Sequence, residues 1–257
     1  MEEQEGLDER AIDPGFRLGF VPGVTPAKWA RVWQERHRDT ALVLIPLDAD
    51  AAEAALIAGD LDAALLRPPV DRTVLHAIVL YAEEPVVVVS RDHAAAALED
   101  AESVDPSDLA DDVLLQPADD VLPWAAAPGA DDGAIAPPGR VPAEVPATTS
   151  DAVALVAAGI GVVVLPRSLA RLHQRKDVTA RALTGGPEAP VALAWVIERE
   201  DDRTEDLIGI VRGRTVNSSR GRRPAQPTAT PSPREPQGGR GTQRPRRPTR
   251  GRGSRRR

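Results

Sequence analysis

The segment Phe16–His37 limits the fold most strongly, because a strand, a tight turn and a helix follow one another within it. Its first six residues, FRLGFV, form an apolar run typical of a buried strand, and Pro22-Gly23 ends that run. Thr25 is predicted to cap the following helix, with Pro26 at the first helical position, where its missing N–H costs no hydrogen bond. A helix that starts directly after a strand directs its free N–H groups towards the sheet edge at which α/β proteins bind ligands.

The same alternation continues downstream. The run ALVLIPL at 41–47 predicts a second buried strand, and Leu61–Leu66 predicts a third. Between them, Asp50 and Glu53 resemble a capping box for a helix that Gly59 ends. Strands and helices at this spacing predict a parallel sheet with right-handed crossovers, so the fold class is α/β.

Later elements are predicted from the same apolar and capping patterns. Strands are expected at Val74–Leu80, Glu84–Ser90, Val113–Leu115, Gly161–Leu165, Val178–Leu183 and Val191–Ile197, and helices at Ala152–Ala158, Ser168–Gln174 and Thr204–Arg212. Residues 119–147 are rich in Pro, Gly, Ala and Asp, with Trp124 as their one large anchor. We therefore expect an irregular segment there, with a single short helix at Trp124–Ala127.

Charge is divided unevenly along the chain. From Arg212 onward the chain has fifteen of its 32 basic residues and one of its 39 acidic residues, Glu235, so residues 1–211 carry a formal charge of −21. Pro, Gly, Arg, Ser and Thr dominate the last segment, and we expect residues 212–257 to be a disordered basic tail. Residues 1–15 are predicted to be a solvated, disordered acidic leader.

Composition excludes several classes of site. The chain has no cysteine, which excludes disulfides, thiolate nucleophiles, zinc–sulfur sites and iron–sulfur clusters. The start MEEQEGLDER lacks the apolar core of a secretory signal, and no apolar run approaches the roughly 18 residues of a membrane span. We therefore expect a cytoplasmic protein with no membrane partner.

Catalytic motifs are not found either. The four histidines are scattered, and no pair has the spacing of metal ligands. Ser168 lacks the G-x-S-x-G context of a nucleophile elbow. The glycines of Gly159-Ile160-Gly161 follow a predicted helix and enter a strand, which reverses the order of a dinucleotide-binding motif. We predict that the protein is not an enzyme and uses no metal or other cofactor.

Six short motifs occur in a set order along the chain. They are FRLGFVPG at 16–23, GDLDAALLRPP at 59–69, EEPVVVVSRDH at 83–93, SDLADD at 107–112, VALVAAGIGVVVLP at 153–166 and VALAWVIERED at 191–201. Each motif alone is common in α/β proteins. Together, from about Phe16 to Val211, they resemble the effector-binding, or substrate-binding, domain of LysR-type transcriptional regulators.

This resemblance implies a type-2 periplasmic-binding-protein fold, in which two α/β lobes joined by two crossing strands enclose a small-molecule effector. Lobe one is expected at 16–90 and 191–211, and lobe two at 91–190. The outgoing crossover is expected near Val86–His93 and the return near Ala192–Arg199.

The resemblance also implies a role in transcription regulation. Family members ordinarily begin with a winged helix-turn-helix and a linker helix, which residues 1–15 are too few to form, so we expect a regulator without its own helix-turn-helix. Members pair through their effector domains, which implies a homodimer.

The effector is expected among loops at the carboxyl ends of strands. The predicted ligand-binding residues are Pro22, Gly23, Val24, Thr25, Arg67, Gln116, Thr148, Thr149 and Ser150. Two helix N-termini that face each other across a cleft, with hydroxyls and a guanidinium, suit a small carboxylate. The alternative is that Thr25 and Ser150 only cap their helices.

The basic tail supports a second hypothesis, a nucleic-acid-binding protein whose α/β body is a scaffold or dimerisation module. Two of its segments loosely resemble the Arg-Gly-Arg-Pro core of AT-hooks, which enters the minor groove of DNA. The predicted contacts are Arg220, Arg222, Arg223, Arg246, Arg247, Arg250 and Arg252. A third hypothesis, an enzyme or solute-binding protein on the same fold, lacks both a catalytic constellation and an export signal.

Overall fold

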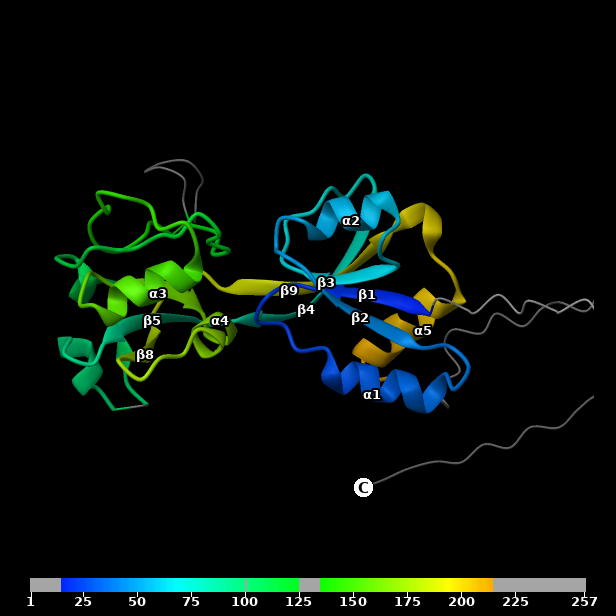
Figure 1. The fold of residues 1–257 in the computed structure, drawn as a ribbon, viewed down its shortest axis with the longest axis horizontal. Helices are drawn as coiled ribbons and strands as arrows, with labels where there is room; N and C mark the ends of the chain where they lie inside the picture. The colour runs from blue at the N-terminus through cyan, green and yellow to red at the C-terminus, as the bar shows by residue number, and fades with distance from the viewer. Residues whose placement is uncertain (1–14, 100, 125–134, 215–257) are drawn as a thin grey trace, which may run out of the picture. The chain divides into compact units, whose positions relative to one another are not determined.

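A computed structural model describes residues 15–99, 101–124 and 135–214. They belong to the first of two units of the chain, residues 1–217. Helices flank two β-sheets (Figure 1), as the α/β prediction requires. The predicted leader as far as residue 14, the proposed helix beyond Trp124 and the tail from residue 215 lie outside the described residues.

The first sheet contains the strands predicted from the opening alternation. Its strands are β1 (Phe16–Phe20), β2 (Leu42–Pro46), β3 (Ala63–Leu66), β4 (Leu75–Glu83) and β9 (Ala189–Val196), in the spatial order β2-β1-β3-β9-β4. Strand β1 pairs in parallel with both β2 and β3, which confirms the predicted parallel pairing. Strand β9 runs antiparallel between β3 and β4.

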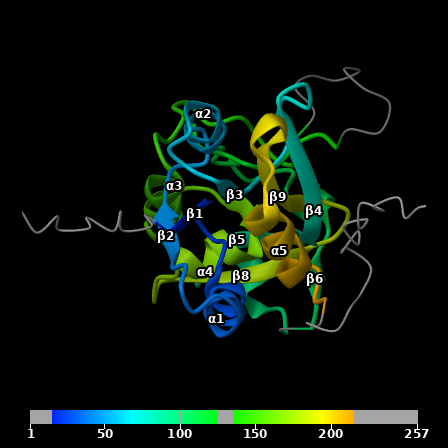
Figure 2. The ribbon, with the colours of Figure 1, turned by 90° about the vertical axis from the view of Figure 1, so that its right-hand side faces the viewer.

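Helices cover both faces of this sheet. Helices α1 (Ala27–Arg36) and α5 (Asp202–Val211) lie on one face, and α2 (Ala52–Ala58) lies on the other (Figures 1 and 2). Trp33 of α1 is fully buried, and its ring lies 5.1 Å from the ring of Phe16 in β1. Because its indole N–H also donates to the Thr40 carbonyl at 2.9 Å, Trp33 fixes α1 against both β1 and the approach to β2.

The second sheet is built on an aliphatic central strand. Its strands are β5 (Pro85–Ser90), β6 (Ser103–Val104), β7 (Val163–Pro166) and β8 (Val178–Leu183), in the order β6-β8-β5-β7. Val87 and Val89 point into one core and Val88 into another, as alternation along a strand requires. The helices here are α3 (Thr149–Ala157) and α4 (Arg167–Leu172), with short 3₁₀ turns at Ala94–Ala97 and Pro106–Leu109; a third 3₁₀ turn, Ile197–Arg199, follows β9 of the first sheet.

The chain leaves the first sheet earlier than predicted. Glu84 alone separates β4 from β5, and β5 pairs wholly within the second sheet. The crossover predicted at Val86–His93 is therefore wrong, and the second sheet begins at Pro85, not after Ser90. The return is also earlier, because β9 already pairs with β4 at Ala189.

Helix α1 begins one residue later than predicted. Pro26 occupies the N-cap position, and no side chain caps the helix, so the predicted cap by Thr25 is wrong. The reason is that Pro26 is buried, and its carbonyl accepts the first-turn N–H groups of Trp29 and Ala30 at 3.0 Å each. Thr25 is left exposed outside the helix.

Two further local predictions are wrong. Ala51 is the N-cap of α2 and makes no side-chain cap bond, whereas Glu53 accepts a hydrogen bond from the Asp71 N–H at 3.1 Å. Glu53 therefore ties α2 to the loop before β4 instead of closing a capping box with Asp50. In place of the strand predicted at 113–115, Val113 and Leu114 form isolated bridges, to Arg140 and Val162 respectively.

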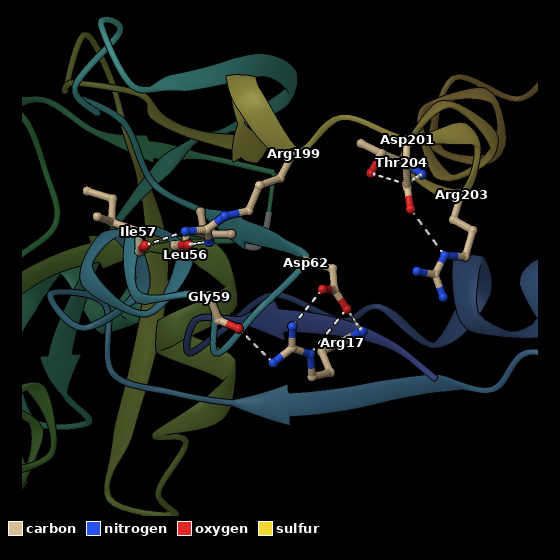
Figure 3. Close-up of polar contacts among 9 residues, drawn as sticks. All are labelled: Arg17, Leu56, Ile57, Gly59, Asp62, Arg199, Asp201, Arg203 and Thr204. Atoms are coloured by element: carbon tan, nitrogen blue, oxygen red, sulfur yellow. Dashed lines mark hydrogen bonds and ion pairs between the residues drawn. The ribbon is translucent and has the colours of Figure 1, made fainter. Parts of the chain in front are cut away.

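Two arginines bind the C-terminal end of α2 (Figure 3). Arg199 donates hydrogen bonds to two of its last carbonyls at 2.9 Å each, and Arg17 donates to the Gly59 carbonyl at 2.7 Å. Arg17 also pairs with Asp62 at 2.7 Å, and the hydrogen bond to that carboxylate raises the pKa of Arg17. Cations suit the negative end of a helix, so these contacts hold α2 against β1 and the segment after β9.

The start of α5 depends on a carboxylate cap, which Figure 3 also shows. Asp201 Oδ1 accepts hydrogen bonds from the Thr204 N–H at 2.8 Å and the Thr204 hydroxyl at 2.9 Å. Burial alone would raise the pKa of Asp201, but the hydrogen bonds from Thr204 and Arg203 outweigh burial and lower the pKa. The cap is therefore strongest when Asp201 is charged.

Replacing this cap by Asp201→Ala is expected to lower the free energy of unfolding by about 1 kcal/mol at neutral pH. Because the native pKa is lowered, the contribution of the charged cap is fully present above the ordinary carboxyl pKa of about 3.9 and is lost as the pH falls through the native value. The difference between variant and wild type should therefore shrink below about pH 4. Urea denaturation across this pH range measures it.

Asp202→Asn is the matched control, because Asp202 is an exposed acid in the same helical turn and does not cap the helix. It should cost less than Asp201→Ala. Equal losses from the two variants would mean that general charge near the helix start, not the cap, stabilises α5.

Candidate functional site

An open cavity of about 780 Å³ is lined by the first sheet, the loop after β1 and helix α4. Its walls come from the ends of β1, β2 and β4, the first turn of α1, and α4. The apolar side chains among them include Phe20, Trp29, Leu47 and Leu172, and the polar ones are Thr25, Lys28, Tyr81, Glu83, Ser168 and Arg171. The volume and the mixed lining are typical of a site for a small organic molecule.

The loop after β1 packs closely on α4. Gly23 has φ +84°, a left-handed conformation that favours glycine, and a Cβ atom there would clash with the Ser168 hydroxyl. It would also approach the Leu169 side chain to 3.2 Å. The absence of a side chain at Gly23 therefore lets the loop and α4 meet at the cavity.

The beginning of α1 makes one wall of the cavity electropositive. The helix has no side-chain cap and no acidic residue in its first turn, where Lys28 is found instead. By contrast, Asp151 lies in the first turn of α3, and Asp201 caps α5. A cation near the positive end of a helix dipole is unfavourable for the helix alone, but the combination suits an anionic ligand.

A buried ion pair lies beside the cavity. Arg67 is 5% exposed and Glu83 is 12% exposed, and Arg67 Nη2 donates to Glu83 Oε2 at 3.1 Å. Ser168 of α4 donates to the same oxygen at 2.7 Å and accepts from Arg67 at 3.3 Å. Glu83 and Ser168 line the cavity, whereas Arg67 does not. Arg67 thus supports the wall from behind by holding the Glu83 carboxylate.

Tyr81 stands two residues before Glu83 on β4 and also lines the cavity. Burial raises the pKa of its phenol, and the negative charge of Glu83 raises it further. The hydroxyl therefore stays neutral at physiological pH and can both donate and accept a hydrogen bond at the cavity wall.

The structure gathers some of the predicted ligand-binding residues and separates others. Residues 22–25, which are Pro22, Gly23, Val24 and Thr25, line the cavity together. Arg67 lies behind it, and Gln116 lies beside Asp120 on another part of the chain. Burial raises the pKa of Asp120, although Gln116 and other donors counteract this.

The predicted residues at the start of α3 make contacts of their own. Thr148 caps the helix by accepting the Asp151 N–H at 3.1 Å, and the buried Thr149 donates to Asp119 at 2.9 Å. Ser150 is exposed within the first turn, so the alternative in which Ser150 caps the helix is wrong. None of the three lines this cavity, where α4 supplies the wall instead.

Sequence reasoning missed five polar residues of the cavity wall. These are Lys28, Tyr81, Glu83, Ser168 and Arg171. Lys28 could have been recognised, because a lysine in an acid-free first turn is unfavourable beside the positive end of the helix dipole. The other four could not be recognised, since tertiary packing alone brings the end of β4 and helix α4 to the loop after β1.

Other predictions concern residues or classes of site away from the cavity. The seven predicted nucleic-acid contacts, residues 220–252, lie outside the described residues, so they stay predictions. Within the described ranges, no group of three or more histidine, aspartate or glutamate side chains is placed to hold a metal ion. None of the helices in those ranges is long and apolar enough to cross a membrane.

Comparison with known proteins identifies similar sequences and folds. Residues 14–215 match the family model of the LysR substrate binding domain. The effector-binding domain of BenM, solved with its effector benzoate, is similar at a TM-score of 0.60 and 21% identity, over 77% of this chain and 90% of that one. No curated protein sequence matches the chain.

Two OxyR structures are also similar. The oxidized form of OxyR gives a TM-score of 0.59 at 22% identity, over 78% of this chain and 95% of that one. The reduced regulatory domain of OxyR from Pseudomonas aeruginosa gives 0.56 at 20% identity, over 78% and 97%. At such identities these likenesses establish the two-lobed fold.

The close approach of the loop to α4 can be tested at Gly23. Gly23→Ala combines left-handed backbone strain with a clash against Ser168, and should destabilise the protein by about 2–4 kcal/mol. Gly159→Ala is the matched control, because Gly159 has φ +79° and no neighbour within 4 Å of the added Cβ. It should show the strain alone, about 1–2 kcal/mol, in chemical denaturation.

A double-mutant cycle with Ser168→Ala isolates the clash. Removing the Ser168 hydroxyl should recover part of the extra loss in Gly23→Ala and none of the loss in Gly159→Ala. Identical losses at the two glycines would show that the loop and α4 do not meet as described.

Proposed function

Because the chain belongs to the family of LysR substrate-binding domains, we propose that it binds a small carboxylate effector in the cavity lined by the β1 loop and α4. Domains of this family are regulatory rather than catalytic. The role that follows for this chain is effector binding in transcription regulation. The protein then responds to whether an effector is bound and does not convert the effector into a product.

The observation that carries this proposal is that two cations and an uncapped helix start line the same cavity. Lys28 and Arg171 are exposed side chains on α1 and α4, and both line the cavity. The ion pair of Glu83 with Arg67 already balances the one acidic side chain of the lining. The two remaining cations and the positive end of α1 favour an anion.

The apolar part of the lining indicates the rest of the ligand. Phe20 and Trp29 are partly buried aromatic residues beside the cavity, and Leu47 adds aliphatic surface. Such a wall stabilises the body of an organic acid by burying its apolar area. Benzoate, the effector in the BenM structure, has this combination of a carboxylate and an apolar ring and supports the proposal.

Removing the cations should weaken binding of a carboxylate. Lys28→Ala and Arg171→Ala are each expected to lower affinity about fivefold, and the double variant more, because each removes one charge-assisted contact. Isothermal titration of the full chain with benzoate and a panel of small carboxylates measures these affinities. Raising the salt concentration should weaken wild-type binding, because exposed charges are screened.

Arg175→Ala is the matched control, since Arg175 is an exposed cation near α4 that does not line the cavity. It should bind the same carboxylate with wild-type affinity. The proposal is wrong if no carboxylate in the panel binds, or if binding ignores both Lys28→Ala and Arg171→Ala.

A further inference from the structure

Glu83 is a conspicuous feature of the cavity, because it is the only acidic residue among the lining side chains. It is the last residue of β4, and its side chain is 12% exposed. A carboxylate with so little access to water must be compensated by hydrogen bonds or by a cation. The hydrogen bonds made by each oxygen of the Glu83 carboxylate therefore show which oxygen is left to bind a ligand.

The two oxygens of the Glu83 carboxylate have different surroundings. Oε2 accepts hydrogen bonds from Ser168 at 2.7 Å and from Arg67 at 3.1 Å. Oε1 accepts none from any residue in the described ranges, and it is not sealed from solvent. Because Glu83 lines the cavity, Oε1 is an acceptor left for water or for a ligand bound there.

Ser168 and Arg67 also fix the direction of this acceptor. Both donors bind Oε2, and they come from different parts of the chain, Arg67 after β3 and Ser168 in α4. A carboxylate held at one oxygen by two donors cannot turn freely, so Oε1 is held ready for a ligand. An ionised carboxylate only accepts hydrogen bonds, so the ligand group opposite must be a donor.

We infer that the effector carries, besides its carboxylate, a hydroxyl or amino group that donates a hydrogen bond to Glu83 Oε1. This inference rests on the proposed function, because it describes a second recognition point in the same cavity. Ser168 and Arg67 act as positioning residues, since they bind Glu83 without replacing the ligand. The effector class is then a hydroxy- or amino-substituted organic acid.

The expected preference among ligands follows from the free-energy cost of leaving Glu83 Oε1 without a hydrogen-bond donor when a ligand covers it. An analogue without the donor displaces water from Oε1 and returns no hydrogen bond, which weakens binding about tenfold to a hundredfold. An analogue that presents an ether oxygen there should bind no better, because two acceptors face each other.

The experiment compares benzoate with its hydroxy, amino and methoxy derivatives at each ring position, by isothermal titration against the full chain. A hydroxy or amino derivative should bind at least about tenfold more tightly than benzoate, and the methoxy derivative at the same position should lose that gain. The hydroxy and amino arms distinguish the two donor groups.

Variants assign the preference to Glu83. Glu83→Gln should bring the affinity ratio of donor to parent compound close to one, since the amide can turn its NH₂ towards the ligand. This change leaves Arg67 buried without its anion and destabilises the fold. Ser168→Ala is therefore the second variant, because it keeps the ion pair and should reduce the ratio severalfold by loosening the carboxylate.

Glu84→Gln is the matched control. Glu84 adjoins Glu83, is 72% exposed, pairs with Arg167 at 3.0 Å and does not line the cavity. It should leave the ratio unchanged. The inference is overturned if no donor-bearing derivative binds more tightly than benzoate, or if the preference persists in both Glu83→Gln and Ser168→Ala.

Failure of the proposed function gives a different result. In that case neither benzoate nor any derivative binds, and the inference falls with it. Binding of all derivatives with equal affinity, lost on removal of Lys28 and Arg171, would support the carboxylate site and refute only the donor contact.

Discussion

The buried guanidinium of Arg67 is the constraint on which the region around the cavity depends. A charge this far from water is tolerated only beside an opposite charge, and Glu83 supplies it at 3.1 Å. Ser168, 101 residues further along the chain than Arg67, completes the cluster. One electrostatic cluster thus links the end of β3, the end of β4 and the start of α4, and the cavity lies beside it.

The sequence predicted the first sheet well because each of its signals is local. An apolar run, a Pro-Gly break and a helix within 22 residues leave few alternatives to a parallel β1–α1–β2 unit, and the structure has that pairing. The lobe crossings were misplaced for the opposite reason. Strands β5 and β9 are aliphatic almost throughout, so their composition does not show which sheet each residue joins. Only pairing partners decide this, and those in β7 and β4 lie between 75 residues away (Val88 and Val163) and 121 residues away (Leu75 and Val196).

The candidate site divides in the same way. Residues 22–25 were predicted because a chain break after a strand is visible in sequence, and they line the cavity. Thr148 and Ser150 were predicted because a capping hydroxyl and a ligand-binding hydroxyl look alike in sequence. In the structure, the Thr148 hydroxyl accepts a hydrogen bond from the Asp151 N–H and caps α3. Glu83 and Ser168 could not be predicted from the sequence. An acid at a strand end and a serine after Pro-Arg are common, and only the folded structure brings these two side chains into contact.

The single residue between β4 and β5 has a mechanical consequence. With only Glu84 between the strands, few backbone torsions are available to change their relative direction, and the Arg167 N–H binds the Glu84 carbonyl at 3.3 Å. A rotation of one sheet against the other about this connection would pivot close to the first turn of α4. Displacement grows with distance from a pivot, so atoms beside the cavity would shift little while the outlying strands β2 and β6 would sweep through longer arcs. A small rotation around a bound molecule would therefore displace β2 and β6 much more than it displaces the atoms near residue 84.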